Sequence, residues 1–79
     1  MDKRYIVFIQ DEWNNLYWIG EFNNLSNAVP EVNEWLETYN VKIDGLEEYA
    51  STFGPAFDKE IETKDESIIM VRGFILWNQ

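Results

Sequence analysis

Two short apolar runs close to the start of the chain predict a β-hairpin. Residues 5–9 and 16–19 consist of β-branched, aromatic and other apolar side chains, a composition typical of strands. Between them, Asn14 and Asn15 belong to a residue type that tolerates turn conformations. Gly20 indicates a bulge or a close approach of the backbone. The first 22 residues are therefore predicted to form a strand, a turn and a second strand.

A helical period follows the hairpin. Apolar side chains recur at helical spacing on one side and acidic side chains on the other: Val29, Val32, Leu36 and Tyr39 against Glu31, Glu34 and Glu37. We expect Ser26 or Asn27 to cap this helix, and Pro30 to fall in its first turn. Asn40 is the expected end. Residues 46–53 also carry apolar residues at helical spacing, which predicts a second short helix that ends at Gly54 and Pro55.

The end of the chain returns to strand patterns. Charged and apolar residues alternate over residues 57–64, which is typical of an edge strand, and residues 67–77 form a final, mostly apolar strand. This order of elements predicts an α+β fold: one domain over residues 1–79, with a four-stranded antiparallel sheet and both helices on one of its faces. The first and last strands are apolar on both sides, which favours central positions and the strand order 2-1-4-3.

Helices on one face leave the second face of such a sheet uncovered. We expect one face to hold Ile6, Phe8, Ile69, Val71 and Ile75, and the other to hold Tyr5, Val7, Ile9, Ile68, Met70 and Phe74. A homodimer mate, another partner or loop side chains could cover the second face. Alternatively, twisting of the strands turns it into a small satellite core.

The composition excludes several kinds of chemistry. The 79 residues contain no His and no Cys, so the commonest general base, thiol nucleophiles, zinc–thiolate sites and disulfides are absent. Adjacent acids at 11–12, 47–48 and 65–66 fall in or beside predicted turns and helix starts, where acids are favoured for other reasons. The four Gly are scattered and form no phosphate-binding loop. We therefore expect no enzymatic activity, no cofactor and no metal.

The charge balance narrows the choice of partner. Asp and Glu number 15 against 6 Lys and Arg, and the resulting net charge of -9 repels nucleic acids and anionic membranes. No apolar run is long enough to cross a bilayer or has the form of a secretory signal. Small secreted domains also tend to be rich in disulfides. The chain is thus predicted to be soluble and cytoplasmic, with a basic protein as its partner.

Three groups of acids are candidates for contacting such a partner. Each group has a regular place on the helix, on the element after it or on the third strand: Glu31, Glu34 and Glu37; Glu47 and Glu48; and Asp58, Glu60 and Glu62. Rows of this kind approach the charge density of a nucleic-acid backbone, so they could occupy the basic groove of a nucleic-acid enzyme. The alternative is that they are ordinary solvated faces that keep an aromatic-rich domain soluble.

Trp13 is the candidate apolar anchor. It lies at the predicted hairpin tip, where burial is hard to arrange, and it directly follows two acids. An exposed Trp beside acids is typical of an interface hot spot. Alternatively, the ring folds back over the hairpin or packs on a second copy.

In bulk properties, this short, acidic, single domain resembles the inhibitors that phages and mobile elements direct against nucleic-acid enzymes. Anti-CRISPR, antirestriction and glycosylase-inhibitor proteins belong to this class. The resemblance implies a non-enzymatic inhibitor that occupies the basic, nucleic-acid-binding surface of its target. Two other classes stay open: an antitoxin or immunity protein that neutralises a basic toxin, and a self-associating structural protein. A toxin gene next to this one would favour the antitoxin, and concentration-dependent association would favour the structural protein.

Overall fold

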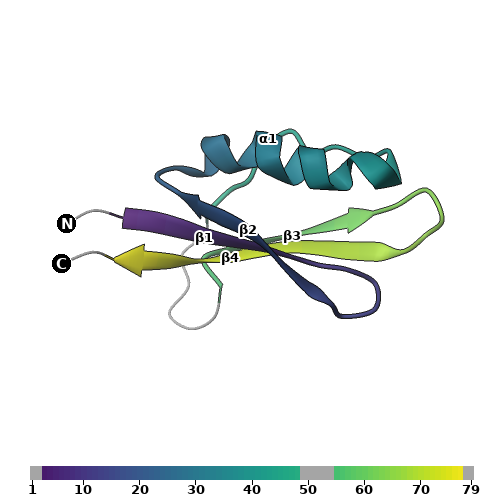
Figure 1. Ribbon diagram of the computed structural model, residues 1–79, viewed down its shortest axis with the longest axis horizontal. Coiled ribbons are helices and arrows are strands. Elements are labelled where there is room, and N and C mark those ends of the chain that lie inside the picture. Colours follow the sequence, from purple (N-terminus) through teal and green to yellow (C-terminus); the bar gives the residue numbers. More distant parts are fainter. Residues whose placement is uncertain (1–2, 49–54, 78–79) are drawn as a thin grey trace.

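The strand order of the sheet determines which surfaces are left uncovered. The computed structural model describes residues 3–48 and 55–77 (Figure 1). In this part of the chain the elements are β1 (Lys3–Gln10), β2 (Leu16–Phe22), α1 (Leu25–Leu36), the 3-10 helix η1 (Glu37–Tyr39), β3 (Phe57–Glu62) and β4 (Ile68–Trp77). The four strands form one antiparallel sheet in the order β2-β1-β4-β3. The predicted α+β fold and strand order are confirmed, and β2 and β3 are the two edges.

The β1–β2 hairpin contains the bulge that Gly20 predicted. Val7 pairs with Gly20, but the next residue of β1, Phe8, pairs with Trp18, so Ile19 is the extra residue on β2. Gly20 has φ 154°, a conformation that residues with a side chain rarely adopt. At the tip of the hairpin, Asn14 has φ 66°, the left-handed conformation that Asn tolerates.

The N-cap of helix α1 lies two residues before the earlier of the two predicted caps. Asn24 is the N-cap, and its side chain accepts a hydrogen bond from the Asn27 backbone N–H at 3.0 Å. Ser26 and Asn27 lie inside the helix, and the Ser26 hydroxyl donates to the Asn24 side chain at 2.6 Å. The earlier start also moves Pro30 beyond the first turn, so the expected position of Pro30 was wrong. Pro30 is exposed, and because it has no N–H, the helix lacks one backbone hydrogen bond at this position.

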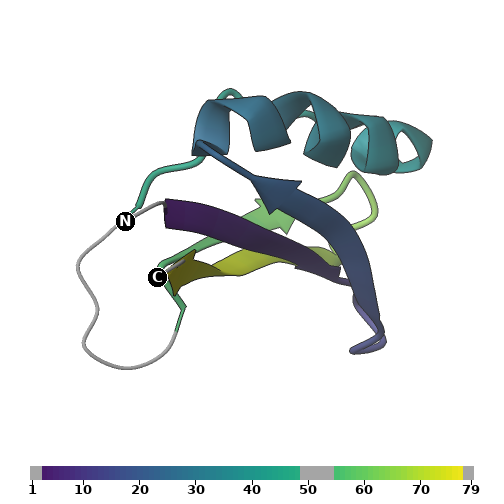
Figure 2. The same ribbon diagram turned by 60° about the vertical axis from the view of Figure 1, so that its left-hand side comes forward.

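One face of the sheet packs against α1 and holds the core. Figures 1 and 2 show the helix lying along this single face. The helix contributes the buried residues Leu25, Ala28, Val32 and Leu36, and the central strands contribute Tyr5, Val7, Ile9, Ile69 and Val71. The predicted face assignment was therefore wrong. Tyr5 pairs with Ile75 and Ile9 pairs with Val71, so these residues share the covered face, while Phe8 pairs with Arg72 on the other.

Two local arrangements complete the covered face. The Phe57 ring lies over Gly73, where an added Cβ would come within 2.3 Å of both that ring and the Ile6 carbonyl oxygen. Ile43 lies in the connector after α1 and is bound by the side-chain amide of Asn33, on α1. This amide accepts a hydrogen bond from the Ile43 N–H at 2.8 Å and donates one to the Ile43 carbonyl at 3.0 Å. This pair fixes Ile43 in the core.

The predicted second helix has no counterpart in the part that can be checked. Residues 46–48 have no helical structure, and residues 49–54 lie outside the described residues. Leu46 packs against the core from an irregular segment instead. None of the helices in the described part of the chain has the length and apolar character needed to span a bilayer.

Candidate functional site

The side of the sheet turned away from α1 carries an unusual number of exposed apolar side chains. Because side chains alternate along a strand, the residues between the core positions all project to this side, which we call the open face. Its apolar members are Ile6, Phe8, Leu16, Trp18, Ile68, Met70, Phe74 and Leu76. Leu16, Trp18 and Phe74 keep 67%, 57% and 42% of their surface exposed. An apolar patch of this kind on a sheet is typical of an interaction surface.

A shallow hollow of about 240 Å³ lies in the middle of the open face. Phe8, Leu16 and Phe74 form its apolar walls, and Gln10 and Arg72 contribute the polar groups. Phe8 is held from below by Trp18, whose ring meets it edge-on at a centroid distance of 5.3 Å. The hollow therefore has mostly apolar walls and could take one apolar side chain.

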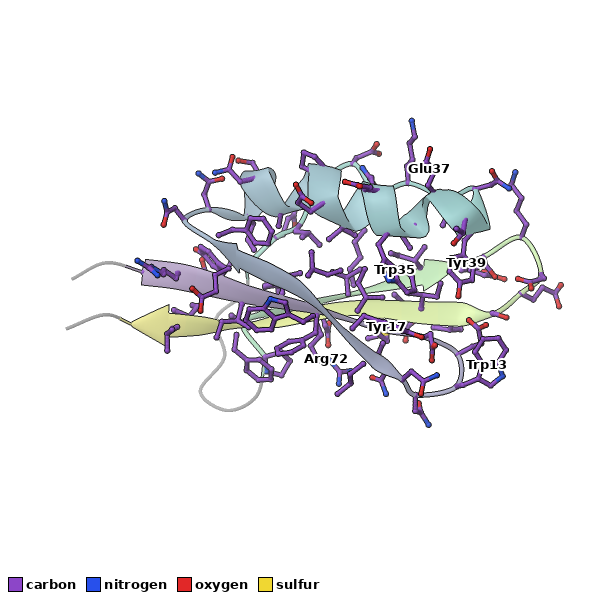
Figure 3. All side chains as sticks on the ribbon, viewed as in Figure 1. Trp13, Tyr17, Trp35, Glu37, Tyr39 and Arg72 are labelled. Carbon is purple, nitrogen blue, oxygen red and sulfur yellow. The ribbon has the colours of Figure 1, made fainter. Side chains whose placement is uncertain are left out.

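Arg72 is the charged residue at the centre of this apolar surface. Figure 3 shows it on the side of the sheet opposite the helix. Its Nε atom is buried and has no hydrogen-bond partner among the described residues. Asp58 lies directly across the β3–β4 pair from Arg72, but the two side chains form no ion pair. The Nε–H group is thus desolvated without a hydrogen bond from the described residues, which is unfavourable for the isolated molecule.

The carboxylates of β3 border the open face. Asp58, Glu60 and Glu62 project to the same side as Arg72, Met70 and Ile68, their partners on β4. All three acids are exposed and, within residues 3–48 and 55–77, form no ion pair. The third-strand row that the sequence predicted therefore exists as a row, at the edge of an exposed apolar surface.

The helix acids lie on the opposite side of the molecule. Glu31, Glu34 and Glu37 are exposed on α1 and η1, and Figure 3 shows Glu37 pointing away from the sheet. Glu34 and Glu37 share a surface hollow with Lys42 and Lys64, which reduces the local excess of negative charge. The helix row and the β3 row therefore cannot contact one flat partner surface together.

The two acids after the helix differ from each other. Glu47 is exposed and lines a hollow that also includes Asp58 and Lys59. Glu48 instead binds Lys3 in an ion pair of 2.8 Å and accepts a hydrogen bond from the Tyr5 hydroxyl at 2.8 Å. The hydrogen bonds from Lys3 and Tyr5 lower the pKa of the Glu48 carboxyl. The Glu48 carboxylate is thus already bound by Lys3 and Tyr5 of the same molecule.

Trp13 is exposed at the tip of the β1–β2 hairpin, with 72% of its surface accessible. The backbone beneath it is held by Asp11, whose carboxylate accepts hydrogen bonds from the Trp13 and Asn15 N–H groups at 2.9 and 2.8 Å. The Tyr17 hydroxyl donates to the same carboxylate at 2.9 Å. The Trp13 ring therefore projects from a fixed turn, as Figure 3 shows.

An aromatic ladder connects this turn to the end of the helix. The Tyr17 ring lies 5.1 Å from Trp35, and Trp35 stacks on Tyr39 at 5.5 Å. Figures 1 and 2 show both hairpin turns and the C-terminal end of α1 at the same end of the molecule. Burial raises the pKa of the Tyr39 hydroxyl, and the charges of Glu12, Asp11 and Asp65 raise it further. This end of the molecule is consequently rigid and negative.

Sequence reasoning missed three of these features. The sequence patterns did not single out Arg72, indicated only a turn position for Asp11, and gave no sign that Leu16 is exposed. The signal for Asp11 was its place at the start of a turn rich in Asn, where Asp commonly binds backbone N–H groups. In the described part of the chain, no three acidic residues are grouped as a metal ion requires.

No family model, no curated protein and no solved structure matches this chain. The functional conclusion therefore depends on the surfaces themselves. Two are notable: the open face with its bordering β3 carboxylates, and the exposed Trp13 at the hairpin tip.

Proposed function

We propose that the protein is a non-enzymatic inhibitor that binds another protein through the open face and the carboxylates of Asp58, Glu60 and Glu62. In this proposal it covers a basic surface that its target uses for nucleic acid. The observation that carries the proposal is the row of exposed carboxylates directly beside an exposed apolar surface. Large apolar side chains at the centre with charges at the border are the usual organisation of a protein interface.

The geometry of the β3 row suits a surface that binds phosphates. Alternate side chains of a strand are about 6–7 Å apart, so Asp58, Glu60 and Glu62 place three negative charges along about 13 Å. One strand of DNA carries a charge for about every 3.4 Å of axis, so the row has about half that linear density. Charges of this density speed the approach to a basic protein, and the apolar centre then supplies contacts that nucleic acid does not make.

The helix row is a poorer candidate for the same contact. Glu34 and Glu37 share their surroundings with Lys42 and Lys64, and none of the exposed large apolar side chains lies on α1. An interface without an apolar centre depends on exposed ion pairs alone, which contribute little. We therefore assign the contact with the basic surface to β3 and the open face.

The proposal locates the protein in the cytoplasm, where nucleic-acid enzymes act and where a domain without disulfides is common. A basic toxin would be bound through the same chemistry, so an antitoxin or immunity protein would use the same surface. Self-association through the open face is the second candidate, favoured by the exposed Trp18 and Phe74. The charge of -9 on each copy opposes it.

Affinity capture with two matched variants tests the proposal. The tagged protein is compared with Asp58→Asn/Glu60→Gln/Glu62→Gln and with Glu37→Gln/Asp44→Asn/Glu66→Gln, which removes the same charge at exposed positions outside the open face. We expect the wild type and the second variant to capture a nucleic-acid-binding protein from host lysate, and added double-stranded DNA or RNA to release it. The β3 variant should lose this protein.

Three outcomes would contradict the proposal. The β3 variant could capture the same protein as the wild type, which would show that the three carboxylates are not part of the contact. Nucleic acid could fail to compete, which would exclude the shared surface. Light scattering over a concentration series could show a stable dimer that requires Trp18 and Phe74, which would mean that the open face binds a second copy of the chain.

A further inference from the structure

The two edges of the sheet differ in how well they are protected against pairing with another strand. Edge strands are usually blunted by charged residues, Pro, bulges or short length. Strand β3 follows this rule, because Asp58, Lys59, Glu60 and Glu62 make it mostly charged. Strand β2 has no Lys, Arg or Pro, and Glu21 is its one charged residue. The β2 edge is therefore open to an additional strand on the hairpin side of the bulge at Ile19.

The hydrogen bonding of the hairpin shows which main-chain groups of β2 are available. The Asp11 N–H donates to the Asn15 carbonyl at 3.0 Å, which makes these two residues a hydrogen-bonded pair. Such pairs alternate along an antiparallel ladder, so Ile9 and Tyr17 form the next one. The N–H and C=O groups of Leu16 and Trp18 therefore point away from β1, towards the side where β2 has no neighbour.

A groove of about 290 Å³ lies between this edge and the helix, and we call it the β2 groove. It is lined by Trp18 and Ile19 on the strand and by Glu31, Glu34 and Trp35 on α1. Glu31 and Glu34 are exposed and form no ion pair with any residue that the structure describes. The Trp35 ring is held in place by Tyr17 and Tyr39. The groove thus has the packed ring of Trp35 on its helix side, together with two carboxylates.

We propose that β2 binds an extended, basic segment of a partner protein as an additional antiparallel strand. The partner residue opposite Tyr17 would lie on the helix side of the sheet, where a Lys or Arg can reach Glu31 and Glu34 and its stem can lie against Trp35. The neighbouring partner residues, opposite Leu16 and Trp18, would lie on the open side and be apolar. This inference uses a surface separate from the β3 carboxylates and goes beyond the proposed function.

Charge complementarity selects this occupant over a second copy of the chain. Edge-to-edge pairing of two β2 strands would bring two molecules of charge -9 together at an edge whose nearest charged groups include Glu21, Glu31 and Glu34. Glu21 already pairs with Arg4 of β1 at 3.4 Å, but β2 and α1 contain no Lys or Arg, and Glu31 and Glu34 form no ion pair with any described residue. A basic strand removes this repulsion and gains the same main-chain hydrogen bonds.

The test uses a capped peptide of alternating Lys and Val, titrated into the isotopically labelled protein at low salt and followed by NMR. We expect amide shifts at residues 16–19 and 31–35. Since the Val residues lie opposite Leu16 and Trp18, their N–H groups donate to β2 and the Lys N–H groups point outward. Methylating the Val amides should therefore abolish binding, whereas methylating the Lys amides should leave it intact. Both peptides have the same charge, so general attraction to an acidic protein cannot produce this difference.

Two protein variants complete the test. Glu31→Gln/Glu34→Gln should weaken binding of the peptide by about 2- to 30-fold, as expected for two exposed ion pairs. Glu37→Gln/Asp44→Asn changes the net charge equally at exposed positions outside the groove and should bind as the wild type does. Equal effects of the two methylated peptides, shifts confined to β3 and β4, or undiminished binding of the peptide to Glu31→Gln/Glu34→Gln would each overturn the proposal.

Discussion

The two faces of the sheet are built from the same strands but serve different purposes. On the covered face, Val7, Ile9 and Val71 are completely buried beneath α1. On the open face, the residues between them remain accessible, and Trp18 and Phe74 are about half exposed. Burial of apolar surface is the main source of stability in so small a domain. The covered face therefore specifies the fold, and the open face can change with little cost to stability.

The matched pair Phe57 and Phe74 provides the strongest test of this comparison. Phe57 is 1% exposed and packs over Gly73, whereas Phe74 is 42% exposed on the open face. Phe57→Ala should lower the free energy of unfolding by about 3–5 kcal/mol, because the transfer and cavity costs add. That is a large share of the stability expected for a domain of this size, roughly 4–12 kcal/mol. Urea denaturation followed by Trp fluorescence measures the change.

Phe74→Ala is the control for this experiment. It should lower the free energy of unfolding by about 1 kcal/mol or less, since an exposed ring loses little burial on truncation. Equal destabilisation by the two substitutions would show that the open face contributes to the core as much as the covered face, and the division between the faces would be wrong.

The second prediction concerns the turn that presents Trp13 and depends on pH. Burial raises the pKa of the Asp11 carboxyl, but the hydrogen bonds from Asn15, Tyr17 and Trp13 together outweigh it and hold the pKa below its ordinary value of 3.8. A lowered folded-state pKa means that the ionised group adds stability above about pH 4, and that this stability is lost as the pH falls through the folded-state value. Asp11→Asn should therefore lower the urea midpoint at neutral pH and match the wild type in strong acid.

A difference between wild type and Asp11→Asn that stays constant with pH would show that the geometry of the turn, not the charge of Asp11, stabilises it. Glu47→Gln serves as the control, because Glu47 is exposed and forms no hydrogen bond or ion pair with any described residue. This variant should unfold at the wild-type midpoint at every pH.

Much of the fold could be predicted from the sequence, because alternation and helical period are local patterns. The strand order followed from β1 and β4 being apolar on both sides. The pairing register did not, since periodicity fixes which residues of one strand share a face but not how two strands align. The helix cap was missed for a similar reason. Asn23, Asn24, Ser26 and Asn27 are all capping types, and the end of β2 decides which of them is used.

The candidate site was predicted in its parts but not in its arrangement. The exposed position of Trp13 and the row of acids on β3 both follow from local patterns. The helix acids and the β3 row lie on opposite sides of the molecule, and this arrangement depends on how the chain folds back on itself. The hydrogen bonds from Lys3 and Tyr5 to Glu48 join residues more than 40 positions apart in the sequence, which no local pattern reveals. Whether these surfaces bind a partner stays a prediction.

The smallest expected effect concerns Arg72, the charged residue within the open face. Its buried Nε atom has no hydrogen-bond partner in the described part of the chain, and an unsatisfied buried donor costs about 1–3 kcal/mol. Arg72→Met keeps most of the length of the side chain and removes the donor, so it should raise the free energy of unfolding by about 1 kcal/mol. Arg4→Met is the control: Arg4 is exposed and only loosely paired with Glu21 at 3.4 Å, so the change should stay within about 0.5 kcal/mol. If Arg72→Met proves destabilising instead, the guanidinium contributes to the packing of the open face, and that face contributes to the stability of the fold.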